Sequence, residues 1–160
     1  MKVIKALRLL LSLILVSLLL CSCMGKEKLS VKEISSELEK ICLNDETAYD
    51  ISKADIENRF NFDGNLLNDS VIKMSNDEEK FILVAVMQVK EKESKQIVID
   101  GINGVVKAAS ASFSVLGDSQ IAQIQGRLFY EYDDVLIVVV AEKYDAVKKY
   151  LEEIGATKVK

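Results

Sequence analysis

The sequence predicts an α+β fold: N-terminal helices, then two strand–strand–helix units that form a four-stranded antiparallel sheet with helices packed on it. Two observations favour this fold. Apolar residues first recur at helical spacing, and the chain then changes to short apolar runs joined by polar turns. The order strand, strand, helix also occurs twice. One hydrophobic core is sufficient for a chain of this length, so we expect residues 30–160 to form a single domain.

The chain starts with a basic segment and an apolar run from Leu9 to Leu20. A positively charged start, a short apolar core and a small-residue exit are typical of a secretory signal. A membrane-spanning helix needs about 20 apolar residues, and this run is 12 residues long. We therefore expect residues 1–22 to be a signal peptide.

Two cysteines follow the apolar run. Signal cleavage requires a small residue before the cut, so Ser22 suits a cut before Cys23, whereas Leu20 is too large for a cut before Cys21. The stretch LCSC thus resembles a bacterial lipobox, the motif read by lipoprotein signal peptidase. The resemblance implies that Cys23 carries a diacylglyceryl group, with residues 23–29 as lipidated cysteine and short tether. The alternative is an ordinary secretory signal with incidental cysteines.

Composition excludes several classes of function. Without the signal the chain would keep 18 basic and 25 acidic residues, a net charge of −7. Anionic lipids and nucleic acids attract basic surfaces, so we expect an acyl anchor at the membrane and no nucleic-acid partner. The chain has no histidine, the commonest general base and metal ligand, and no second cysteine pair to complete a four-ligand site. We expect no metal, no cofactor and no enzymatic activity.

Two helices are expected before the strands. Residues 30–43 have apolar residues at helical spacing and a capping-box pattern formed by Ser30 and Glu33. Residues 52–60 start with a second pattern of this kind, which predicts a short helix. Cys42 lies beside the apolar stripe of the first helix and is followed by acidic residues. We expect a buried thiol there rather than a reactive nucleophile.

Four strands and two further helices make up the rest of the predicted domain. The strands are expected at residues 71–75, 81–89, 122–132 and 135–141, and the helices at residues 93–113 and 144–154. Short polar turns predict antiparallel hairpins, and we expect the helices to cover one face of the sheet. Gly101 and Gly104 interrupt the first of these helices and indicate close helix packing or a kink. Gly155 is suited to end the second.

The third predicted strand carries a candidate binding surface. Alternation places its residues on two faces, with Arg127, Phe129 and Glu131 on one and Leu128, Tyr130 and Tyr132 on the other. One set should point outward, and exposed aromatic side chains on an uncovered sheet would form a binding surface. The candidate residues are Phe129, Tyr130 and Tyr132. Alternatively, the first two helices lie over this face, or the tyrosines rim the sheet.

Several stretches together resemble the bacterial lipoproteins of domain-of-unknown-function family 4358. They are the lipobox, the early helix, AYDISKADIE, the first hairpin with its apolar strand, the amphipathic helix, and YDDVLIVVVAEKYDAVKKYLEEI. The likeness spans about residues 30–155. The family usually carries a Tyr-Pro-like stretch before the third strand, where this chain has SFSVLGDSQ. The resemblance implies no known activity, so no catalytic residue is carried over.

These observations lead to one expected function and two alternatives. We expect a lipid-anchored, non-enzymatic interaction module on the extracytoplasmic face of the cell membrane, with an envelope protein as its candidate partner. One alternative is a carboxylate-dependent envelope hydrolase that uses Asp133, Asp134 and Glu142, because glycosidases need two carboxyls about 5–10 Å apart. The other is a small-ligand sensor, which needs an internal pocket that a sequence does not display.

Overall fold

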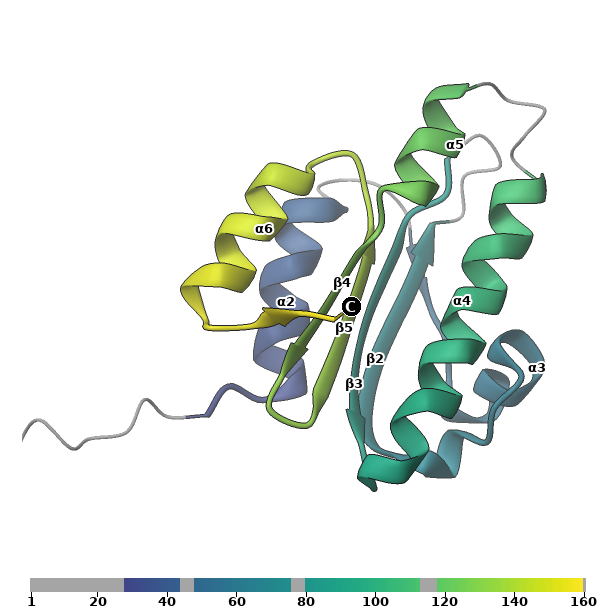
Figure 1. Cartoon of the computed structure of the whole chain (residues 1–160), viewed down its shortest axis with the longest axis vertical. Helices are drawn as coiled ribbons and strands as arrows, with labels where there is room; N and C mark the ends of the chain where they lie inside the picture. The colour runs from purple at the N-terminus through teal and green to yellow at the C-terminus, as the bar shows by residue number, and fades with distance from the viewer. Residues whose placement is uncertain (1–27, 44–47, 76–79, 113–117, 160) are drawn as a thin grey trace, which may run out of the picture.

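A six-stranded antiparallel sheet forms the centre of the structure, a computed structural model that describes residues 28–43, 48–75, 80–112 and 118–159 (Figure 1). The strands are β1 (Ala48–Asp50), β2 (Leu67–Ser75), β3 (Leu83–Val89), β4 (Leu128–Tyr132), β5 (Val135–Val140) and β6 (Thr157–Lys158), in the spatial order β1-β2-β3-β5-β4-β6. The mixed α+β fold is confirmed. The sheet has six strands rather than the expected four, because short strands pair along both outer edges.

Helices cover both faces of this sheet. Helices α2 (Val31–Cys42) and α6 (Tyr144–Glu153) lie on one face, and α3 (Ile56–Phe60), α4 (Lys95–Ser112) and α5 (Asp118–Gln125) lie on the other (Figure 1). The expectation that helices cover a single face is therefore wrong. The physical reason is that the central strands carry apolar side chains on both sides, and each side needs its own cover.

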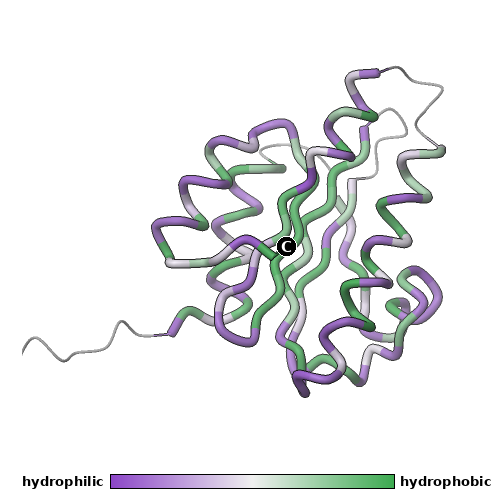
Figure 2. Tube along the Cα trace, viewed as in Figure 1, coloured by the Kyte–Doolittle hydropathy of each residue, from purple (hydrophilic) through white to green (hydrophobic). Residues whose placement is uncertain are grey.

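The central strands β3 and β5 show this two-sided burial directly. Along β3, Leu83, Ala85 and Met87 join the core under α4, while Val84 and Val86 join the core under α2 and α6. All six residues of β5 are buried. Figure 2 shows the same division, with hydrophobic residues along the central strands and hydrophilic residues on the outer sides of the helices.

Local sequence signals set the ends of several helices. Ser30 caps α2 as predicted: the Glu33 amide donates to Ser30 Oγ over 3.3 Å, and the Ser30 amide donates to Glu33 Oε2 over 2.8 Å. The helix expected at residues 52–60 is split into a 3₁₀ turn, Lys53–Asp55, and α3. After α6, Gly155 adopts a φ of +86°, which glycine allows at little steric cost and which confirms its role in ending the helix.

The predicted third strand begins too early. Residues 122–125, expected to be the start of a strand, belong to α5, and β4 starts only at Leu128. The helix buries Ile124 against the core while its other residues stay at least partly exposed. The Gly126 amide donates to the Ala122 carbonyl oxygen over 2.8 Å at its end. This single buried position does not show the alternation of buried and exposed residues that is typical of a half-buried strand.

Candidate functional site

The predicted aromatic surface is covered in the structure. Tyr130 is 6% exposed and lies in the core under α2 and α6, and Tyr132 packs half-buried beside that core. Phe129 points to the other face, where it packs half-buried against the core under α4. The alternation along β4 is as predicted, but the uncovered aromatic stripe is not present in the described residues. Strand β4 is flanked by β5 and β6, and its aromatic side chains pack on the core under α2 and α6 on one face and on the core under α4 on the other.

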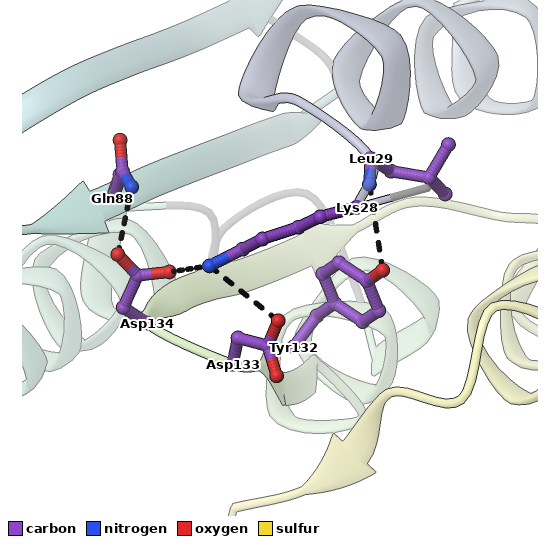
Figure 3. A network of polar contacts seen from close by, with 6 residues as sticks. All are labelled: Lys28, Leu29, Gln88, Tyr132, Asp133 and Asp134. Carbon is purple, nitrogen blue, oxygen red and sulfur yellow. Dashed lines mark hydrogen bonds and ion pairs between the residues drawn. The ribbon is translucent and has the colours of Figure 1, made fainter. Parts of the chain in front are cut away.

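The hairpin between β4 and β5 instead holds the start of the described chain. Asp133 adopts a left-handed φ of 54° in the turn, a conformation that aspartate tolerates better than most residues. Lys28 Nζ lies 2.7 Å from Asp134 Oδ1 and 3.4 Å from Asp133 Oδ2 (Figure 3). Gln88 on β3 donates from Nε2 to the other oxygen of Asp134 over 2.7 Å. We call these four residues the hairpin clasp.

A second contact fixes the chain beside the hairpin clasp. The Leu29 amide donates to the hydroxyl of Tyr132 over 3.4 Å (Figure 3). The Leu29 side chain packs against the core under α2 and α6. Ser30 then caps α2, so the entry of the chain into the fold is fixed over three consecutive residues. The tyrosine predicted to bind a partner thus has a structural contact of its own.

Electrostatics in the hairpin clasp favour the charged forms. The hydrogen bond from Lys28 is the main cause that lowers the pKa of Asp134, and the bond from Gln88 adds to it. The same hydrogen bond raises the pKa of Lys28. Both side chains are about half exposed, so solvent screens the pair and its energetic contribution is small. The clasp therefore serves to place Lys28 more than to stabilise the fold.

A hollow of about 340 Å³ lies between this hairpin and the start of α4. Three of its carboxylates are already paired: Lys95 on α4 donates to Glu131 on β4, and Asp133 and Asp134 belong to the hairpin clasp. Its charged lining residues are Lys90, Glu91, Lys92, Lys95, Glu131, Asp133 and Asp134. Because the charges are of both signs and nearly balanced, this hollow has no clear preference for an anion or a cation.

The three acids of the hydrolase alternative do not meet. Asp133 and Asp134 lie before β5 and Glu142 lies after it. Six strand residues at about 3.3 Å each separate them by about 20 Å, which exceeds the range for either glycosidase mechanism. Glu142 instead lies 3.8 Å from Lys80 Nζ. A general acid also needs a raised pKa, and the pKa of Asp134 is lowered.

One of the three cysteines, Cys42, lies among the described residues. Cys42 is 8% exposed, and burial raises the pKa of its thiol to about 12, as expected for a small hydrophobic side chain. Cys21 and Cys23 lie outside the described residues.

Within the described ranges, no group of three or more acidic, cysteine or histidine residues is placed to hold a metal ion. None of the described helices has the length and apolar character needed to cross a membrane.

Comparison with known proteins gives no relative: no family model matches the chain, and neither the curated proteins nor the solved structures include a significant match. The resemblance to domain-of-unknown-function family 4358 therefore stays a prediction.

The sequence indicated Asp133 and Asp134 as candidate residues but did not indicate their partners, Lys28 and Gln88. Lys28 is 106 positions from Asp134 in the chain, and no local pattern signals such a pairing.

Proposed function

We propose that the protein is a lipid-anchored lipoprotein on the extracytoplasmic face of the cell membrane, where it acts as a non-enzymatic binding module. The observation that carries the anchor is the stretch LCSC directly after a basic start and a short apolar run. It offers Cys23 for a diacylglyceryl group. Two acyl chains on one residue give the stable attachment that a single chain does not.

The contacts at the start of the described chain support a defined orientation on the membrane. Five peptide units separate Cys23 from Lys28, so the chain between them reaches at most about 17 Å. Lys28 is held at the β4–β5 hairpin by Asp133 and Asp134. An anchor at Cys23 would therefore keep this end of the sheet close to the bilayer and direct the opposite end away from it.

The binding role is supported by what the candidate acids do. Asp133 and Asp134 are both paired with Lys28, so both act as structural partners of a lysine. Glu142 is far from the hairpin acids, as the length of β5 requires. These contacts favour a binding module over the carboxylate hydrolase.

The anchor is tested by two single substitutions expressed with the native N-terminus. Cys23→Ala should move the protein from the membrane fraction to the soluble fraction and abolish labelling by an alkyne-tagged fatty acid. Cys21→Ala, two positions away, should change neither result. Full membrane retention and labelling of the Cys23→Ala protein would overturn the lipobox interpretation.

The binding role is tested by crosslinking in cells that express the natively anchored protein, with the Cys23→Ala form as the control. We expect one envelope protein to be recovered with the anchored form and lost with the control. A known lipoprotein that crosslinks well in the same cells validates the procedure. If that lipoprotein crosslinks and this protein recovers none, the proposal of a protein-binding module fails.

A further inference from the structure

A groove runs beside α4 on the face of the sheet away from α2 and α6. It consists of two adjoining hollows of about 320 Å³ and 290 Å³, which share Asn103, Gln125 and Arg127. One hollow is bounded by α4 and the end of α5, and the other by α4, β4 and β6. We call the two together the α4 groove.

The length of the α4 groove follows from helix geometry. Helix α4 contributes Ile99, Asn103, Val106 and Ser110, which lie on one side of a helix at steps of four, three and four residues. Eleven steps from Ile99 to Ser110, at a rise of about 1.5 Å each, give a length of about 16 Å. An extended peptide advances about 3.3 Å per residue, so about five of its residues match this length.

The charge of the α4 groove is of one sign. Lys107, Arg127 and Lys158 line it, and the described residues that line the two hollows include no aspartate or glutamate. This contrasts with the chain as a whole, which has a net charge of −4. Among the described residues none of these three cations has a carboxylate partner, whereas Lys28 and Lys73 each have two and Lys95 has one.

Arg127 is held in place at the junction of the two hollows. Its Nη2 donates to Asn103 Oδ1 on α4 over 2.9 Å. The amide orients the guanidinium group without neutralising its charge, and a guanidinium has further N–H groups that suit the two oxygens of a carboxylate. Arg127 is thus positioned to receive an anion between Lys107 and Lys158.

The groove also offers apolar contact. Ile99, Phe129 and Val159 line the hollow next to β4 and β6, and all three are half-buried against the core. On the opposite face the neighbouring Tyr130 is 6% exposed. Phe129, which the sequence placed in a binding surface, therefore contributes to a groove rather than to an open sheet face.

We propose that the α4 groove binds an extended, acidic peptide segment of a partner protein, about five residues long, whose carboxylates face Lys107, Arg127 and Lys158 and whose apolar side chains contact Phe129. Charge complementarity and the length of the groove are the grounds for this choice. The inference rests on the proposed binding role, but it does not depend on the lipid anchor. Arg127 precedes β4 and the hairpin clasp follows it, so an anchored molecule would present the groove away from the bilayer.

The test measures peptide binding to the full mature protein purified in detergent. The probe is a set of fluorescein-labelled five-residue peptides that each combine three Asp or Glu with two Leu or Phe, in every order, read by fluorescence anisotropy. A matched set with Asn and Gln in place of the acids is the peptide control. We expect acidic peptides to bind, their affinity to fall with added salt, and the amide set to bind at least about 10-fold more weakly.

Protein variants locate the site. Arg127→Gln should weaken binding about 10-fold, because hydrogen bonds to charged groups are among the stronger ones. Lys107→Gln and Lys158→Gln, whose side chains are exposed, should weaken it less and leave the thermal unfolding curve unchanged. Lys148→Gln and Lys149→Gln are matched charge controls, because both residues lie on α6 at the other face of the sheet, and they should bind normally.

Three results would overturn the inference. In the first, no acidic peptide binds. In the second, all the groove variants bind the peptides as tightly as the unchanged protein does. In the third, an equal concentration of succinate displaces the peptide, which would indicate a site for small anions. Failure here is distinguishable from failure of the proposed function. If crosslinking still recovers a partner and the groove variants do not reduce it, the binding module stands and its surface lies elsewhere.

Discussion

Single residues at the β4–β5 hairpin show how position decides the role of an acidic side chain. Asp133 and Asp134 occupy a turn, where acidic residues are usually solvated. Here both meet Lys28, and Asp134 also accepts from Gln88. The sequence placed these acids at a hairpin tip correctly. Their use as partners of the entering chain depends on tertiary structure, which no local spacing encodes.

Replacing Lys28 with methionine should raise the pKa of Asp134 toward its ordinary value, because the hydrogen bond from Lys28 is the main cause that lowers it. A carboxyl with a lowered folded-state pKa stabilises the fold above its unfolded-state pKa, and this contribution is lost as the pH falls through the folded-state pKa. Lys28→Met should therefore lower the melting temperature at neutral pH and have no effect at a pH below both values. NMR titration of the Asp134 carboxyl carbon measures the shift.

The control for this prediction is Lys32→Met, which removes an exposed lysine in the first turn of α2. It should leave the titration of Asp134 unchanged. An unaltered titration curve in Lys28→Met would mean that the contact between Lys28 and Asp134 does not persist in solution.

At the scale of elements, the sequence predicted those segments whose period is strong. Helices α2 and α6 and strands β3 and β5 lie within a few residues of their expected places. Strands β1 and β6, with three and two residues, are too short to show any alternation. Helix α5 was merged with β4 because only one of its residues, Ile124, is buried, and one position defines no period.

The cover on both faces of the sheet had a signal in the sequence. The β5 stretch VLIVVV and the β3 stretch LVAVMQV are almost continuously apolar. A strand with one solvated face alternates between apolar and polar residues, whereas a strand buried on both faces does not. This pattern predicts two layers of helices, and it also indicates that an open aromatic face beside β5 was not to be expected.

The two glycines of α4 should respond in opposite ways to alanine. A Cβ at Gly101 would lie 2.4 Å from the Phe60 carbonyl oxygen and 2.5 Å from Phe62 Cδ1, whereas nothing lies within 4 Å of one at Gly104. Gly101→Ala should therefore force α4 away from α3 and lower the free energy of unfolding by about 1–3 kcal/mol. Gly104→Ala should raise it by up to about 1 kcal/mol through helix propensity alone.

Chemical denaturation of the two variants under the same conditions measures the difference. Each protein is the matched control for the other, because the substitution and the helix are the same. Equal effects of Gly101→Ala and Gly104→Ala on stability would contradict the close packing of α4 on α3. That packing is the part of the glycine prediction that the structure confirms, since it places Phe60 and Phe62 directly against Gly101.

At the scale of the whole molecule, one sheet joins two separate hydrophobic cores. The core under α4 and the core under α2 and α6 have no buried residue in common, yet both draw on β3 and β5. Neither layer of helices has a second sheet to pack on, so loss of the sheet exposes both cores at once. We therefore expect the two layers of helices and the sheet to unfold as one cooperative unit.

Two core truncations on opposite faces test this cooperativity. Ile102 on α4 and Leu151 on α6 are both fully buried, each in a different core. Ile102→Ala and Leu151→Ala should each lower the free energy of unfolding by about 2–5 kcal/mol. Because the sheet separates them and they share no core, the two losses should add in the double variant to within about 0.5 kcal/mol. Ile97→Ala, at a 51% exposed position of α4, is the control and should change stability by less than about 0.5 kcal/mol.

The shape of the unfolding transition then distinguishes one domain from two. In a single cooperative unit, circular dichroism of the helices and near-ultraviolet signals of the tyrosines follow one curve in every variant, and each truncation shifts the whole curve. If the two faces unfolded independently, Leu151→Ala would shift only the part of the signal that reports α2 and α6, and a plateau would separate two transitions. Since β3 contributes alternate residues to both cores, a layer that melts alone would have to leave half of that strand's buried side chains in water. The cost of that exposure, at about 25 cal/mol per Å² of apolar surface, is the physical reason to expect one transition.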